Sequence, residues 1–138
     1  MIWIMKAELI FGAYAYDDWE GTIEIESSST LEDLHFALQK ILNFDNDHLY
    51  EFYVSRTERS HERIRYDDEN EMVFDITLEE LYPLEKKNKL FYLFDYGDSW
   101  TFKLTKSRKK PQAPVHGIEY PRLIEEAGVK PFQYPSWE

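Results

Sequence analysis

Six side chains in this sequence are candidates for acid–base catalysis or metal binding. They are two histidines and four aspartates: His35, His48, Asp45, Asp47, Asp95 and Asp98. If the fold brings them together, imidazole and carboxylate groups in one pocket can act as general acid and base or bind a divalent metal. In that interpretation His35, His48 and Asp98 are the candidate catalytic residues, and the identity of any metal stays unknown.

The same residue types also have a structural interpretation, which we favour. His35 falls on the apolar face of an expected helix, where a half-buried histidine with satisfied hydrogen bonds is common, and the aspartates stand in turn sequences. His35 and His48 are thirteen positions apart, so they do not match a pair of metal ligands on one helical face. We therefore assign no catalytic residue, expect no cofactor, and keep Asp45, Asp47 and Asp95 as binding candidates.

The sharpest local motif is DYGDSW at residues 95–100. A glycine turn flanked by two carboxylates and an aromatic ring can present a binding edge, so Trp100 is a further binding candidate. Alternatively, Asp95 and Asp98 cap a tight hairpin, with Gly97 supplying a positive φ. Trp100 then enters the core, as tryptophan in an alternating strand usually does. A lone glycine matches no phosphate-binding loop.

One cluster of basic residues follows this motif: Lys103, Lys106, Arg108, Lys109 and Lys110. It can contact a DNA backbone or an acidic protein surface, including a second copy of this chain, or it can form a solvated loop. The whole chain has 16 basic and 27 acidic residues and a net charge of −11. That balance argues against a broad nucleic-acid surface and limits DNA contact to this patch.

Length and charge predict one domain with two compositional parts. The chain has 138 residues, and its first 102 hold 9 basic and 23 acidic side chains, against 7 and 4 in residues 103–138. We expect an acidic α+β body over residues 1–105 and a basic, proline-containing extension over residues 106–138. The chain has no cysteine and no apolar run of membrane-spanning length, so we expect a cytoplasmic protein without a membrane partner.

Apolar periodicity predicts most of the strands. Residues alternate between apolar and polar over 3–11, 19–26 and 100–105, and residues 48–54 are rich in aromatic and β-branched types, both typical of strands. The first two should form an antiparallel hairpin with an acidic outer face. Residues 90–94 form a near-continuous apolar run, as in a central strand, and the charged residues 55–71 should form a solvated hairpin or loop.

Capping residues predict the helices. Ser29 and Glu32 form a capping box that opens a helix through residue 42, and Thr77 and Glu80 open a short helical turn. A further helical segment is predicted from Pro121 to Gly128, because proline suits a first turn and glycine a helix end. Beyond it, the aromatic residues Phe132, Tyr134 and Trp137 suggest a tail packed on the body.

These elements together predict an α+β fold. We expect a mostly antiparallel mixed sheet of about five or six strands packed against one main helix, with a short helix and an aromatic C-terminal extension.

Three segments together resemble the plasmid pRiA4b ORF-3-like family of bacterial and archaeal proteins. They read LEDLH at 31–35, FDNDHLYEF at 44–52 and FYLFDYGDSW at 91–100, with a weaker fourth, YPRLIE, at 120–125. The resemblance runs through nearly the whole chain and implies an α+β domain, and some members are described as resolvase-like. Members commonly have a histidine where this chain has Phe102, and many have a cysteine near the C-terminus. A site that used that histidine is therefore missing here.

We interpret the chain as a non-catalytic binding or interaction module of unknown ligand, associated by resemblance with plasmids and mobile elements. Its partner is unknown, and another protein or a second copy of the chain are the candidates. One alternative is a hydrolase-like or metal-dependent enzyme that uses His35, His48 and the nearby aspartates. Another is a DNA-associated accessory protein that uses the basic stretch from Lys103 to Lys110.

Overall fold

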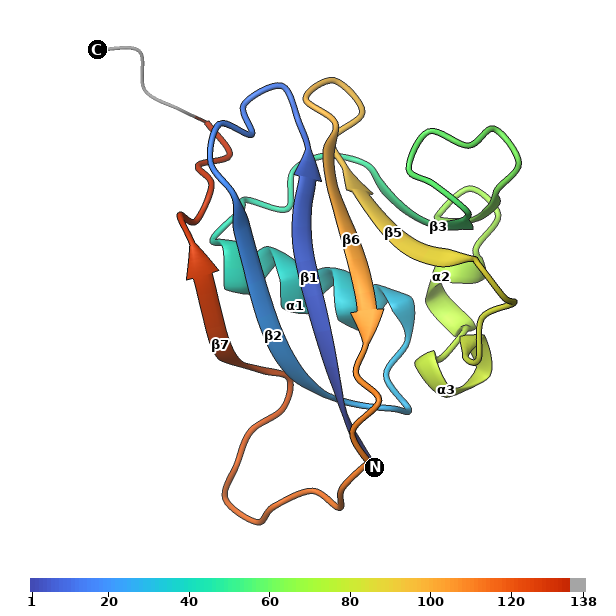
Figure 1. The fold of residues 1–138 in the computed structure, drawn as a ribbon, viewed down its shortest axis with the longest axis vertical. Helices are drawn as coiled ribbons and strands as arrows, with labels where there is room; N and C mark the ends of the chain where they lie inside the picture. The colour runs from blue at the N-terminus through green and yellow to red at the C-terminus, as the bar shows by residue number, and fades with distance from the viewer. Residues whose placement is uncertain (135–138) are drawn as a thin grey trace.

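A single antiparallel sheet dominates the computed structural model, which describes residues 1–134 (Figure 1). Its seven strands run in the order β4-β3-β5-β6-β1-β2-β7, so β4 and β7 form the two edges. The strands are β1 (Ile2–Phe11), β2 (Trp19–Glu26), β3 (Tyr50–Ser55), β4 (Ile64–Asp67), β5 (Lys89–Phe94), β6 (Trp100–Lys106) and β7 (Arg122–Gly128). The fold is α+β, with seven strands instead of the five or six expected.

Three short helices accompany the sheet within residues 1–134, so the expectation of one main helix is not supported. They are α1 (Leu31–Leu42), α2 (Met72–Asp75) and α3 (Leu78–Leu81). Figure 1 shows α1 lying across one face of the sheet, behind β1 and β2. No helix in the described part of the chain is long and apolar enough to cross a membrane.

The helix α1 begins one residue later than predicted. Thr30, not Ser29, is the N-cap: its hydroxyl accepts from the Asp33 amide at 3.1 Å, and the Asp33 carboxylate accepts from the Thr30 amide at 2.9 Å. Ser29 is already used in a turn, because its amide donates to Glu26 and its carbonyl accepts from Leu78. The capping box predicted at Thr77 and Glu80 is confirmed at the start of α3.

The core lies between α1 and the sheet. The predicted hairpin of β1 and β2 is confirmed, with Met5 opposite Ile23 and Ala7 opposite Gly21. Their core-facing side chains pack with Leu34 and Leu38 of α1. The central strands add five buried aromatic rings to this core, which are Phe52, Tyr92, Phe94, Trp100 and Phe102. Tyr53 and Phe91 are also buried, but they stack on each other outside this cluster. Many of the aromatic residues of the sequence therefore fill this core.

The segment predicted as a helix from Pro121 to Gly128 is a strand, so that prediction is wrong. β7 pairs with β2, with Arg122 opposite Glu24 and Gly128 opposite Trp19. Proline and glycine can mark the ends of a strand as well as those of a helix. A segment of seven residues is too short for its apolar period to distinguish a strand from a helix. Backbone pairing with the edge of β2 makes this segment a strand. Part of the basic extension thus belongs to the sheet.

Of the aromatic residues in the tail, Tyr134 contacts the body and Phe132 does not bury its ring. Phe132 is 75% exposed, whereas the Tyr134 hydroxyl reaches Asp47. Trp137, which we also expected to pack on the body, lies outside the described residues.

Gly128 gives a test of how β7 is held. It has a φ of +84°, and a Cβ there would overlap the backbone of Asp18, whereas Gly117 has a φ of +87° with open space around it. We expect Gly117→Ala to lower the free energy of unfolding by about 1–2 kcal/mol, the cost of a left-handed alanine. Gly128→Ala should cost more and should speed amide exchange in β7. Equal costs for the two variants in urea unfolding would contradict this account.

Candidate functional site

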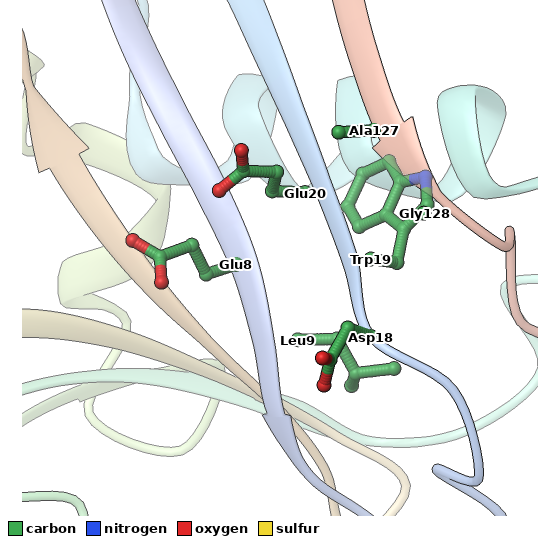
Figure 2. A pocket seen from close by; sticks show the side chains of 7 residues that line it. All are labelled: Glu8, Leu9, Asp18, Trp19, Glu20, Ala127 and Gly128. Atoms are coloured by element: carbon green, nitrogen blue, oxygen red, sulfur yellow. The ribbon is translucent and has the colours of Figure 1, made fainter.

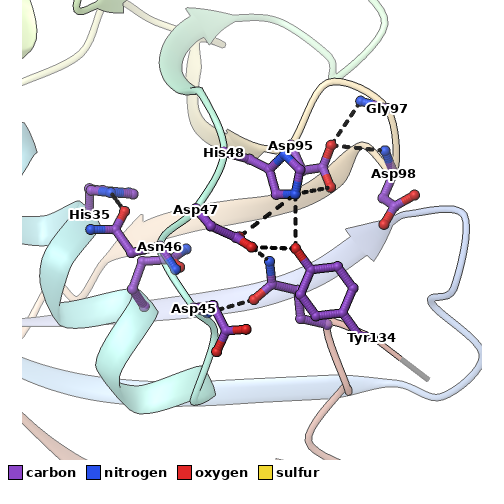
Figure 3. A network of polar contacts seen from close by, with 11 residues as sticks. His35, Asp45, Asn46, Asp47, His48, Asp95, Gly97, Asp98 and Tyr134 are labelled. Atoms are coloured by element: carbon purple, nitrogen blue, oxygen red, sulfur yellow. Dashed lines mark hydrogen bonds and ion pairs between the residues drawn. The ribbon is translucent and has the colours of Figure 1, made fainter. Parts of the chain in front are cut away.

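Most of the nominated polar residues meet at one corner of the sheet (Figure 3). His48, in the loop between α1 and β3, lies there with its Nε2 3.5 Å from Asp95 Oδ2 and 3.7 Å from Asp47 Oδ1. The same nitrogen is 2.9 Å from the Tyr134 hydroxyl. The loop after α1 and the turn after β5 therefore lie side by side, whereas the sequence offered convergence of all six side chains only as the less favoured interpretation.

The segment at residues 133–134 occupies this corner. The side-chain Nε2 of Gln133 donates to Asp47 Oδ1 at 2.7 Å, and its Oε1 accepts from the backbone N–H of Asp45 at 2.6 Å. The Tyr134 hydroxyl donates to Asp47 Oδ2. This last bond raises the pKa of Tyr134 to about 12 and lowers the pKa of Asp47. Both Asp47 oxygens are thus engaged by the chain's own C-terminal segment.

The turn after β5 is shaped by Asp95 and not by Gly97, contrary to the expectation of a positive φ at the glycine. Asp95 itself has a φ of 63°, and its Oδ1 accepts from the amides of Gly97 at 3.0 Å and Asp98 at 3.3 Å. Partial burial, followed by the neighbouring Asp95 charge, raises the pKa of Asp98. Trp100, which follows, is fully buried in the core.

His35 lies in a separate, buried network. The Gln39 side chain donates to the Tyr92 hydroxyl at 3.0 Å, and that hydroxyl lies 2.6 Å from His35 Nδ1. His35 Nε2 is 2.7 Å from Asn46 Oδ1, and the backbone N–H of Asn46 donates to Gln39 Oε1 at 2.9 Å. The bonds form a closed ring of four residues, which we call the His35 ring. It joins α1, the following loop and β5.

The ring assigns the protonation state of His35. Because Tyr92 accepts from Gln39, its hydroxyl proton is free to donate to Nδ1, and Nε2–H then donates to the Asn46 carbonyl. A second proton on the imidazole would occupy Nδ1, which could then no longer accept from the Tyr92 hydroxyl. Burial accordingly lowers the pKa of His35 to about 4, partly offset by the bond to Asn46. The imidazole also stacks on Tyr50, with ring centroids 3.5 Å apart.

The two histidines do not form one site. Both imidazoles pack on Phe94, with centroid distances of 6.2 Å for His35 and 6.0 Å for His48. Within residues 1–134, however, His35 bonds only to Tyr92 and Asn46, and no group of three or more His, Asp or Glu side chains could hold a metal ion. His35, His48 and Asp98 line none of five of the best-formed surface cavities among residues 1–134.

The basic cluster is divided by its contacts. Lys103 lies 3.9 Å from Glu8, and the Lys106 ammonium lies 4.6 Å from the centre of the Trp3 ring. Arg108, Lys109 and Lys110 stand on the loop between β6 and β7. They make no ion pair with any carboxylate of residues 1–134. Three charges, not five, are therefore available to an external anion.

Two surface hollows were not predicted from the sequence. One, of about 430 Å³, is lined by Glu8, Asp18 and Glu20 on the open side of β1 and β2 (Figure 2). The other is a groove of about 750 Å³ between α1 and the start of β7. A helix at residues 121–128 predicts neither hollow, because both hollows depend on β7 lying beside β2.

Three polar residues in these contacts were not among the sequence candidates: Gln39 and Asn46 in the His35 ring, and Gln133 beside Asp47. Gln39 follows His35 by four residues on the apolar face of α1, so two polar groups at buried positions were visible in the sequence. Such a pair predicts a buried polar network. Nothing in the sequence pointed to Gln133.

Comparison with known proteins supports the fold. The profile of the plasmid pRiA4b ORF-3-like family matches residues 17–133. A crystal structure of a protein of unknown function from Methanosarcina mazei Go1, MM3350, is similar with a TM-score of 0.72 and 21% identity. The similarity covers 91% of this chain and 68% of that one. No curated protein matches the chain.

Removing one hydroxyl tests the His35 ring. Tyr92→Phe leaves His35 Nδ1 and the Gln39 amide without a partner, so we expect the free energy of unfolding to fall by about 1–3 kcal/mol. Tyr82→Phe is the matched control, because the buried Tyr82 hydroxyl has no hydrogen-bond partner within the described residues. Its removal should leave stability unchanged or slightly higher. Equal effects in urea unfolding would refute the ring.

The pH dependence of stability tests the neutral state of His35. An unfolded imidazole takes up a proton near pH 6.5, whereas the folded one does so only near pH 4. The contribution to stability is therefore complete above pH 6.5 and is lost as the pH falls to 4, by about 3 kcal/mol. We expect His35→Gln to remove this part of the slope and the exposed control His116→Gln to retain it. Identical slopes in both variants would contradict the assignment.

Proposed function

This chain belongs to the plasmid pRiA4b ORF-3-like family, and from that premise we propose that it is a non-catalytic module that binds another protein. Neither the family nor the Methanosarcina structure supplies an activity, so the proposal is argued from the chain's own residues. Any association with plasmids comes from the family name alone.

The observation that carries the proposal is how three of the six nominated side chains, His35, Asp47 and Asp95, are used. Both nitrogens of His35 are bonded inside the core, and both oxygens of Asp47 are bonded by Gln133 and Tyr134. Asp95 orders its own turn. A general acid or base must reach a substrate proton across a cavity, and these groups instead hold parts of the fold together. This arrangement supports a structural role over a hydrolase or a metal enzyme.

A protein partner fits the charge and the shape better than DNA does. The net charge of −11 repels a phosphate backbone. The three available cations Arg108, Lys109 and Lys110 would release few counterions, and such contacts alone give weak binding. A free sheet edge, by contrast, is a common site for binding an extended segment of another protein.

Selection from a displayed library of random linear peptides tests this function. We expect peptides that share a motif to be enriched on the full chain, with dissociation constants on the order of micromolar for a modest interface. Binding should persist with a metal chelator and in the variants His48→Gln and Asp98→Asn, within about twofold. These substitutions alter the nominated catalytic groups without changing the sheet edge. If no peptide is enriched, the proposal is overturned.

A further inference from the structure

The edge strand β7 offers one side of its backbone to a partner. It pairs with β2 along its other side and is the last strand in the sheet (Figure 1). In an antiparallel strand, alternate residues direct their N–H and C=O groups away from the neighbour. The ladder with β2 also shifts register between Thr22 and Ile23, which leaves Ile124 outside the pairing and 42% exposed.

A groove runs beside this edge. On one side it is lined by Phe36, Lys40 and Ile41, which share a face of α1, and on the other by Tyr120, Arg122 and Leu123. Its volume is about 750 Å³, which is in the range of peptide and ligand sites. Phe36 is 49% exposed there, so a large apolar side chain faces solvent at the groove.

An open strand beside a helix-lined groove matches what strand addition requires. Main-chain hydrogen bonds along the edge provide affinity, and alternate side chains of the added segment enter the groove and provide specificity. The seven residues of β7 present about three or four outward-facing backbone positions. The opposite edge, β4, has four residues and offers about half that ladder.

We propose that an extended segment of a partner protein adds to the free edge of β7, placing apolar side chains against Phe36 and Ile41 and a side-chain carboxylate against Lys40. This inference rests on the proposed protein-binding function and names its site and the chemistry of the partner.

Three cations, Lys40, Arg122 and Lys130, and two carboxylates, Asp33 and Glu119, line the groove. The carboxylate proposed for the partner follows from which of these cations lacks an internal partner. Arg122 Nε lies 2.6 Å from Glu24, and Lys130 lies 3.3 Å from Glu126, so both have internal partners. Lys40 is exposed and makes no ion pair with any carboxylate of residues 1–134. An acidic side chain of the partner therefore has one cation available to it in this groove.

A second copy of this chain is a poorer occupant. The middle of β7 carries Glu125 and Glu126. Antiparallel pairing of two β7 strands about a twofold axis near their centres sets these carboxylates against one another. Like charges directly opposite destabilise a strand pair. A segment that is neutral or basic opposite Glu125 avoids that cost, so the charges favour a different protein.

Side-chain variants test the groove, with the enriched linear peptides as the probe. Phe36→Ala should weaken their binding to the full chain about tenfold, and Lys40→Glu by a similar factor that shrinks at high salt. Phe74→Ala and Lys86→Glu are the matched controls, because Phe74 and Lys86 are exposed and line neither side of the groove. Both controls should bind within about twofold of wild type.

Amide exchange tests the added strand itself. A bound peptide should slow exchange at alternate amides of β7 and leave β4 unchanged, whereas a peptide held only by side chains would leave both edges unchanged. Peptides that bind without protecting β7, or without sensitivity to Phe36→Ala, would overturn this inference while the proposed function stands. If no peptide is enriched at all, both fall.

Discussion

The buried ring of hydrogen bonds through His35, Gln39, Asn46 and Tyr92 is the constraint on which the positions of the surrounding elements depend. It places four polar side chains in or beside an apolar core, where each unmade bond is costly. Two of the four bonds reach Tyr92 of β5 and two reach Asn46 of the loop, so they fix α1 against both β5 and the loop that follows the helix. Hydrophobic packing alone would hold α1 on the sheet with less directional precision.

Two surfaces follow from that placement. The loop fixed by Asn46 presents Asp47 and His48, which bind the segment at residues 133–134. The outer face of α1 presents Phe36 and Lys40 beside β7, which forms the groove. A histidine that looks catalytic in the sequence thus acts at a distance from any ligand, by positioning elements. This division agrees with the proposed binding role, because His35 and Asp47 hold elements of the fold together.

Much of the fold could be predicted from the sequence, and the errors have physical causes. Strands with clear alternation, such as Trp19–Glu26, were predicted at the observed bounds because side-chain burial imposes a period of two. β7 was mistaken for a helix because its identity depends on pairing with β2, a contact far away in sequence. Of the candidate site, convergence of the nominated side chains was only the less favoured interpretation, and Gln133 was not nominated, since a single glutamine carries no local pattern.

The central claim is that the free edge of β7, beside α1, receives an extended segment of another protein. The most direct measurement is a set of interstrand nuclear Overhauser contacts between β7 and an enriched peptide bound to the full chain. The account predicts regular backbone contacts from Leu123 to Ala127, together with peptide side-chain contacts to Phe36. Peptide contacts confined to the corner of His48 and Tyr134, with none along β7, would contradict it.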